Sequence, residues 1–349
     1  MDLTNLKKLI SEKVSCYQDV EIDNNILVHG GRDTCEKRWE MLEPHLNDNS
    51  VIMDIGSDLG YFVQRIAQRF KKSLVLSFEQ TPSSCEIQKE IYKQLKLYNA
   101  LVFCYKFWIE TLQRLSQAVE MIDTILFLAV LHHYSEKEQR QVLKLCSSMI
   151  PEIIIEYIVQ IGNGAWGGVA YLDFEKVLPD YYSHVEVIGI SHDGPSERRV
   201  LIKAWNNSFE REGLNPTMFD KYDLSNSIPN HKIIYKDGVW ELRSKTKTDE
   251  NVYPKVHDDF VKGVSLYNLL FLKPVWPVSV WFQEQAKKAY TDLLDKNIEI
   301  SNIHLPNLIF TADGLKAIEF VNCSGNFDRP TADKCIQDIV EVLKQMNLN

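Results

Sequence analysis

Seven short apolar runs, separated by charged stretches with helical periodicity, occupy the chain from about residue 50 to residue 205. The runs lie at 50–54, 73–78, 100–104, 124–128, 152–156, 184–189 and 199–204. Continuous β-branched runs are typical of strands buried on both faces, and the intervening helical stretches predict a mainly parallel sheet covered by helices. The last two runs are joined by too few residues for a crossover helix, and the join contains the turn sequence Asp193–Pro195. The final strand of this α/β sheet is therefore predicted to run antiparallel.

The pattern changes after Asn207, and this change divides the chain. A length of 349 residues favours roughly two domains. We predict one domain over 1–207, in which helices at 3–15 and 33–43 cover the sheet, and a smaller α+β domain over 208–349. In the second domain, the composition predicts a loop over 208–230 and the pattern predicts a hairpin over 232–240. Helices are expected at 279–296 and 331–347, and a second hairpin is centred on Asp313-Gly314.

The overall charge argues against an extended nucleic-acid surface, because the chain has 39 basic residues and 48 acidic ones. The seven cysteines contain no C-x-x-C pair, so we expect reduced thiols rather than a zinc ribbon. The start of the chain lacks the apolar core of a signal peptide, and Ile125–Leu131 is far shorter than the ~20 residues of a membrane span. We expect a cytoplasmic protein without a membrane span, peripheral to the inner face of the membrane through partners.

The most informative string is Val51–Phe62, which follows the first apolar run. It places Asp54 at the end of a strand and glycines 56 and 60 in the turn to a helix. Glycine allows the backbone to approach a ligand closely, and the Asp54 carboxylate suits a cationic amino-acid moiety rather than a pyrophosphate. Glu79 ends the next strand, 25 residues after Asp54, where an acid can bind both hydroxyls of a ribose. The alternative is a plain strand-to-helix turn, with Asp54 as a cap and Glu79 solvated.

This string resembles motif I of the class I S-adenosylmethionine-dependent methyltransferases, whose sheet is Rossmann-like with a reversed last strand. The segment 31–40, just upstream, resembles the methyltransferase half of the WbdD family, bifunctional methyltransferase–kinases that cap polymannose O-antigen chains. The resemblance implies S-adenosyl-L-methionine as cofactor. It implies these cofactor-binding residues: Asp54, Gly56, Ser57, Gly60, Glu79, Gln80, Tyr105 and Arg38.

The acceptor is expected at the carboxyl end of the fourth run, where His132 and His133 are the candidate catalytic residues. A neutral imidazole suits a general base for a hydroxyl acceptor, whereas with a phosphate acceptor it would hold the phosphate in line. The alternative is that one ring merely packs. Guanidinium groups suit an anionic acceptor, and glycine-flanked Trp166 is a candidate for stacking on a sugar. The expected acceptor-binding residues are Arg32, Arg198, Arg199 and Trp166; ordinary surface charge is the alternative for some of the arginines.

The segment 300–320 resembles the catalytic and metal-binding loops of protein-kinase-like folds. Asn302 stands where that pattern has its base Asp, Asn307 matches the metal-binding Asn, and Glu319 stands at the metal-binding Asp. The resemblance therefore implies a truncated, degenerate kinase-like module, for which we expect neither kinase activity nor Mg/ATP binding. The alternatives are a nucleotide-binding remnant that takes Mg²⁺ through Asn307 and Glu319, and a chance resemblance.

The predicted function is that of an S-adenosylmethionine-dependent O-methyltransferase with a phosphate- or sugar-bearing acceptor. The resemblance places it in surface polysaccharide biosynthesis, on O-antigen (lipopolysaccharide) or capsule. Its expected partners are an anionic glycan or small-molecule acceptor and glycan-assembly proteins. The alternatives are a tRNA or small-metabolite methyltransferase, a cofactor-binding module without turnover, and an active kinase.

Overall fold

The computed structural model describes most of the first predicted domain and parts of the second. The described residues are 3–12, 18–22, 25–30, 35–106, 109, 112, 122–160, 172–192, 197–212, 231–244, 263–265, 274–276, 284, 288 and 308–317. The sequence-predicted helices at 279–296 and 331–347 lie outside this set, apart from single residues. The statements below concern the described residues.

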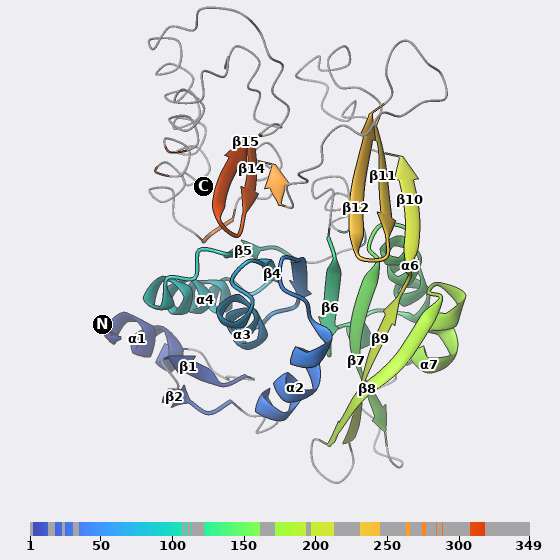
Figure 1. Ribbon diagram of the computed structural model, residues 1–349. Coiled ribbons are helices and arrows are strands. Elements are labelled where there is room, and N and C mark those ends of the chain that lie inside the picture. The colour runs from blue at the N-terminus through green and yellow to red at the C-terminus, as the bar shows by residue number, and fades with distance from the viewer. Residues whose placement is uncertain are drawn as a thin grey trace, which may run out of the picture.

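A seven-stranded, mainly parallel sheet organises the first part of the chain (Figure 1). Its strands are β3 (Val51–Ile55), β4 (Leu74–Glu79), β5 (Ala100–Cys104), β6 (Thr124–Leu128), β7 (Glu152–Gln160), β8 (His184–His192) and β9 (Glu197–Trp205). The strand order is β5-β4-β3-β6-β7-β9-β8. Each strand coincides with one of the apolar runs, which confirms the α/β sheet predicted from the sequence.

The last strand of the sheet is reversed, as predicted. Strand β9 lies between β7 and β8 and runs antiparallel to both, whereas β3 to β7 pair in parallel. The edge strand β8 has an irregular register between Val187 and Gly189. A side chain at Gly189 would collide with the sulfur of Met41, so this glycine allows the helix that carries Met41 to pack against the sheet edge.

Helices cover both faces of the sheet and enclose two apolar cores. On one face lie α1 (Thr4–Glu12), α2 (Cys35–Leu42), α3 (Tyr61–Arg69) and α4 (Pro82–Leu95), the first two matching the helical cover predicted at 3–15 and 33–43. The other face is covered by α6 (Glu136–Ser147) and α7 (Phe174–Val177). Short 3₁₀ turns η1 (Glu43–His45), η2 (Leu131–His133) and η3 (Leu178–Asp180) complete this part. No described helix combines the length and apolarity needed to cross a bilayer.

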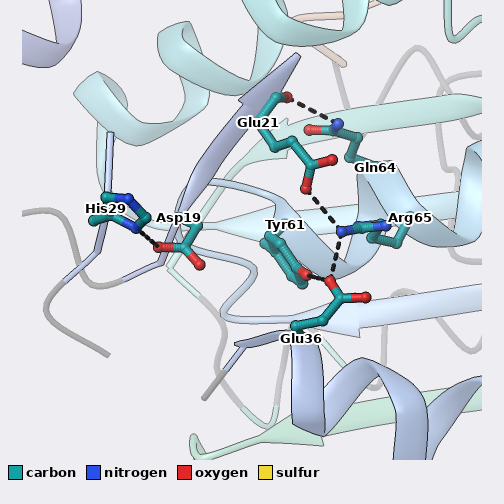
Figure 2. A network of polar contacts seen from close by, with 7 residues as sticks. All are labelled: Asp19, Glu21, His29, Glu36, Tyr61, Gln64 and Arg65. Atoms are coloured by element: carbon teal, nitrogen blue, oxygen red, sulfur yellow. Dashed lines mark hydrogen bonds and ion pairs between the residues drawn. The ribbon is translucent and has the colours of Figure 1, made fainter. Parts of the chain in front are cut away.

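A two-stranded hairpin that the sequence analysis missed, β1 (Val20–Ile22) and β2 (Asn25–Val28), docks on α3 through polar contacts (Figure 2). Arg65 donates to Glu21 of β1 at 2.8 Å and to Glu36 of α2 at 2.6 Å. Tyr61 donates its hydroxyl to the same Glu36 at 2.7 Å. The side-chain oxygen of Gln18 also accepts a hydrogen bond from the backbone N–H of Tyr61. These hydrogen bonds hold β1 and α2 against α3.

The remaining strands form two small antiparallel sheets. One contains β10 (Ser208–Glu212), β11 (His231–Lys236) and β12 (Val239–Ser244), and the other contains β13 (Val264–Ser265), β14 (Leu308–Thr311) and β15 (Gly314–Ala317). Both predicted hairpins are confirmed. The prediction of loop over 208–230 is wrong for 208–212, because the neighbouring hairpin supplies a partner strand for this polar segment. The kinase-like character of the second domain stays a prediction.

Segment 274–276 extends the main sheet at its β5 edge. Val102 exchanges two backbone hydrogen bonds with this segment, at 3.1 and 2.7 Å. Trp276 is 1% exposed, donates its indole N–H to the carbonyl of Leu97 and stacks on Tyr98. The chain beyond residue 207 is thus anchored on the seven-stranded sheet by a buried aromatic side chain.

Candidate functional site

Two buried carboxylates, Asp54 and Glu79, lie on the same face of the sheet at the carboxyl ends of neighbouring strands. In the parallel register Asp54 is opposite Ser77, and Glu79 lies two residues further along β4. Because alternate strand residues share a face, both side chains point toward the α2–α4 layer. Asp54 is 2% exposed and Glu79 is 7% exposed. The two acids that the sequence analysis selected are therefore brought together.

Asp54 has an unusual electrostatic environment for an aspartate. Burial raises the pKa of its carboxyl from 3.8 to about 7, and the charge of Glu79 adds to this effect while Arg38 opposes it. Its Oδ2 atom has no hydrogen-bond partner among the described residues. A buried carboxylate oxygen without a partner is energetically costly, and a cationic ligand would relieve that cost.

Glu79 is held rigidly by two backbone N–H groups. Its Oε2 accepts a hydrogen bond from Asp58 at 2.9 Å, and its Oε1 accepts one from Thr81 at 2.7 Å. Each carboxylate oxygen can accept a further hydrogen bond. Glu79 is therefore fixed in orientation and retains the acceptor capacity that a pair of ribose hydroxyls requires.

The glycine turn after β3 packs closely against protein side chains. Gly56 and Gly60 have φ of 72° and 79°, a region that disfavours other residues. A Cβ at Gly56 would lie 2.6 Å from Cγ2 of Val130, and a Cβ at Gly60 would lie 2.1 Å from the hydroxyl of Tyr92. Backbone conformation and packing therefore require glycine at both positions, and their predicted contact with a ligand stays a prediction.

The side chain of Ser57 is bonded to its protein neighbours, and the cofactor contact that the resemblance implies for this residue stays a prediction. It is 1% exposed, and its hydroxyl lies 2.7 Å from that of Ser77 and 2.9 Å from the amide nitrogen of Gln88. Gln88 also donates to the carbonyl of Asp58 at 2.6 Å, and Tyr92 donates to the carbonyl of Gly60 at 3.1 Å. The turn is therefore supported from α4 by Gln88 and Tyr92, which sequence analysis missed. Their only signal was the i, i+4 spacing of two polar residues on a buried helix face.

Arg38 reaches the same face of the sheet from α2. Its guanidinium lies over the ring of Phe62, 4.7 Å from the centroid, and donates through Nη2 to Glu156 of β7 at 2.5 Å. The buried Nε of Arg38 has no partner in the described part of the chain. Asp54 thus offers an unused acceptor and Arg38 an unused donor. An amino-acid headgroup, with its ammonium and carboxylate, is the chemistry that satisfies both.

The candidate catalytic histidines lie in η2, directly after β6. The rings of His132 and His133 are 3.9 Å apart, with a tilt of 43°; His132 is half-buried and His133 is exposed. The helix that follows is held by a capping box between Ser135 and Glu138. The histidine turn is therefore fixed at both ends, at the edge of the sheet where ligands of α/β proteins bind.

The two arginines of β9 do not share a site. Consecutive strand residues point to opposite faces, and Arg199 faces Glu156 with Nη1 at 3.7 Å and 1% exposure. Arg198 is half-buried and its charge lowers the pKa of Tyr157, against the larger effect of burial. The two side chains therefore point to opposite faces of the sheet, and the predicted acceptor contacts of Arg198 and Arg199 stay predictions.

The remaining candidates are placed as follows. Gln80 is exposed just after Glu79, and Tyr105 is half-buried, its backbone N–H donating to the carbonyl of Glu79 at 2.9 Å. Burial raises the pKa of Tyr105. Within the described ranges no group of three or more His, Cys, Asp or Glu side chains is arranged to hold a metal ion. The candidates outside the described residues are Arg32, Trp166, Asn307 and Glu319.

Comparison with known proteins finds similar structures only. No protein-family model and no curated protein matches the sequence. The bifunctional kinase-methyltransferase WbdD is similar over 98% of this chain and 87% of that one, with 13% identity and a TM-score of 0.48. The N-terminal domain of EvdMO1, crystallised in the presence of SAH and D-fucose, is 13% identical over 59% of this chain and 97% of that one, with a TM-score of 0.43.

A further similar structure is magnesium protoporphyrin IX methyltransferase (ChlM) from Synechocystis PCC 6803 with bound SAM. It is 17% identical, covers 50% of this chain and 78% of its own, and has a TM-score of 0.38. The fold itself is evident from the strand order and the reversed β9. It is the Rossmann-like sheet with a reversed last strand that the sequence predicted for the first part of the chain.

Proposed function

We propose that this protein is an S-adenosylmethionine-dependent O-methyltransferase that acts on a phosphate- or sugar-bearing acceptor. The observation that carries the proposal is the pair of buried acids on one face of the sheet. Asp54 keeps an oxygen without a partner among the described residues, and Glu79 is fixed by two backbone N–H groups. This arrangement favours a positively charged nucleoside over a dinucleotide, whose pyrophosphate an acid at Asp54 would repel.

The residues present fit the cofactor's three polar parts. In our proposal Asp54 binds the ammonium, Arg38 binds the carboxylate through its unused Nε, and Glu79 accepts hydrogen bonds from the ribose hydroxyls. A charged hydrogen bond of this kind contributes about 1.5–3 kcal/mol. When bound, the cofactor supplies an electrophilic methyl carbon on a positively charged sulfur.

The acceptor side is proposed to act mainly by positioning. For a hydroxyl acceptor, His132 or His133 would accept the hydroxyl proton as general base. For a phosphate acceptor no proton needs to leave, and the same ring holds the phosphate in line. Arg198 and the upstream Arg32 are the proposed contacts to an anionic group on the acceptor, and Trp166 is the proposed stacking surface for a sugar.

We propose surface polysaccharide biosynthesis as the context, on O-antigen or capsule, with the protein in the cytoplasm and in contact with glycan-assembly proteins. The support for this context is the resemblance of 31–40 to the WbdD family, together with the acidic composition, which disfavours a broad nucleic-acid surface. In this proposal residues 208–349 are a kinase-like module without phosphotransfer, and Mg/ATP takes no part.

The test is a methyl-transfer screen with isotopically labelled donor against matched phosphorylated and unphosphorylated oligosaccharides. Transfer to either set supports the proposal and identifies the acceptor class. Transfer only to tRNA or to a small metabolite would refute the glycan assignment. Cofactor binding without transfer to any acceptor would refute the enzymatic assignment in favour of a binding module. ATP hydrolysis with Mg²⁺ would refute the assignment of the second domain.

A further inference from the structure

Glu156 is a buried acid that the proposed chemistry does not use. It lies on β7 opposite Leu128 at the carboxyl end of β6, and it is 2% exposed. Its carboxylate accepts from Arg38 at 2.5 Å and lies 3.7 Å from Arg199. Its backbone carbonyl also accepts from Ala129 at 3.2 Å, in the turn that leads to the histidines. Glu156 therefore contacts both Arg38, a proposed cofactor-binding residue, and the turn that leads to the candidate catalytic histidines.

Arg38 is shared between two carboxylates that compete for it. One is Glu156, which receives the hydrogen bond from Nη2. The other is Asp54, close enough for the charge of Arg38 to lower its pKa. Because the guanidinium also packs on Phe62, it is held in one orientation. In that orientation Asp54 Oδ2 has no partner among the described residues.

Arg199 places a second guanidinium beside Glu156. A buried carboxylate without a counter-charge is strongly disfavoured, and the second guanidinium provides that charge from β9. Glu156 therefore contacts two guanidinium groups, Arg38 from α2 and Arg199 from β9.

We propose that Glu156 is a positioning residue: it holds Arg38 away from Asp54 and so keeps an oxygen of Asp54 available for a cationic headgroup. The inference rests on the proposed function, because the headgroup is that of the cofactor. In the absence of Glu156, Arg38 turns to Asp54 and closes the position that the ligand requires.

The charged groups that act on Asp54 are Arg38 of α2 and Glu79 of β4. The neutral phenol of Tyr92, on α4, lies close enough for the charge of Asp54 to raise its pKa. Loss of the Glu156 charge by itself also lowers the pKa of Asp54, so the variant that reports the movement of Arg38 is Glu156→Asp, which keeps that charge. An attraction between Arg38 and Asp54 lowers the pKa of Asp54.

The experiment uses the full chain with Glu156→Gln, which keeps the shape of the side chain and removes its charge. The matched control is Glu152→Gln at the amino end of the same strand, where Glu152 pairs with Lys203 at 2.6 Å. In the first arm, the pH dependence of unfolding is measured without ligand, each variant with and without Asp54→Asn. In the second arm, calorimetry measures binding of S-adenosylhomocysteine.

We expect Glu156→Gln to lower the pKa of Asp54 by about one unit and to weaken S-adenosylhomocysteine binding about tenfold. Glu152→Gln should leave both unchanged even if it lowers stability as much. An Asp54 titration that is the same in Glu156→Gln and wild type would overturn the proposal.

A second variant covers the case in which Glu156→Gln does not fold. Glu156→Asp keeps the charge that balances the two arginines but withdraws the carboxylate by one methylene, and it should shift both readouts in the same direction. If wild type does not bind S-adenosylhomocysteine, the proposed function fails, whereas the ligand-free arm still decides whether Glu156 controls Arg38.

Discussion

Replacement of Asp54 by Asn should stabilise the ligand-free protein at neutral and alkaline pH while weakening its binding of a cationic ligand. The pKa of Asp54 is raised from 3.8 to about 7 by burial. This difference of about 3 units corresponds to about 4 kcal/mol, at about 1.4 kcal/mol per unit. The cost arises because the folded protein must hold a carboxylate that burial and Glu79 disfavour.

The sign of the pH dependence follows from the direction of this shift. A carboxyl whose pKa is higher in the folded state than in the unfolded state favours folding while it is protonated, and this contribution is lost as the pH rises. The free energy of unfolding of wild type, relative to Asp54→Asn, should therefore fall by about 4 kcal/mol between about pH 4 and pH 8.

The assay is urea-induced unfolding of both proteins across that pH range. Asp180→Asn is the matched control, because Asp180 is exposed and its replacement should leave the pH profile parallel to that of wild type. Parallel profiles for wild type and Asp54→Asn would refute the argument, because they would mean that burial of Asp54 stores no free energy for a ligand to recover.

Three further outcomes are expected. Glu79→Gln should weaken S-adenosylhomocysteine binding roughly tenfold or more in calorimetry, through loss of charge-assisted hydrogen bonds of ~1.5–3 kcal/mol; unchanged affinity would exclude a ribose contact. Gly60→Ala should lower the free energy of unfolding by more than about 1 kcal/mol, because the φ of Gly60 is 79° and a Cβ would collide with the Tyr92 hydroxyl. Adding Tyr92→Phe to this variant removes the hydroxyl and should restore part of the loss in thermal melts. Arg198→Ala should raise KM for an anionic acceptor with little change in melting temperature, whereas Arg199→Ala should lower the melting temperature; the reverse pattern would contradict the assignment of the two faces.

The main sheet could be predicted because its strands have continuous apolar runs of the right length. The reversed last strand also followed from a short connection with turn residues. The hairpin at 20–28 was missed, because it is short and is stabilised by tertiary contacts to α3 rather than by its own pattern. Strand β10 was missed for a similar reason, since its polar sequence becomes a strand only when β11 is beside it.

The acids of the site were predictable, since their spacing follows the strand repeat, but their surroundings were not. Protein side chains pack against Ser57 and the glycines, which the local sequence does not reveal, and the cofactor contacts predicted for these residues stay predictions. Arg199 was assigned to the acceptor although strand alternation separates it from Arg198. Glu156, Gln88 and Tyr92 belong to other elements, and only the folded arrangement brings them to the site.

The most direct test of the whole account is a calorimetric titration of the full chain with S-adenosylmethionine at several pH values. Asp54→Asn and Glu79→Gln serve as paired variants. The account predicts saturable binding to wild type that strengthens as the pH rises through about 7, where Asp54 ionises. Binding to each variant should be weaker by about tenfold or more, because each substitution removes a charged acceptor for a ligand hydrogen bond. Equal affinity in all three proteins, or no binding to wild type, would contradict it.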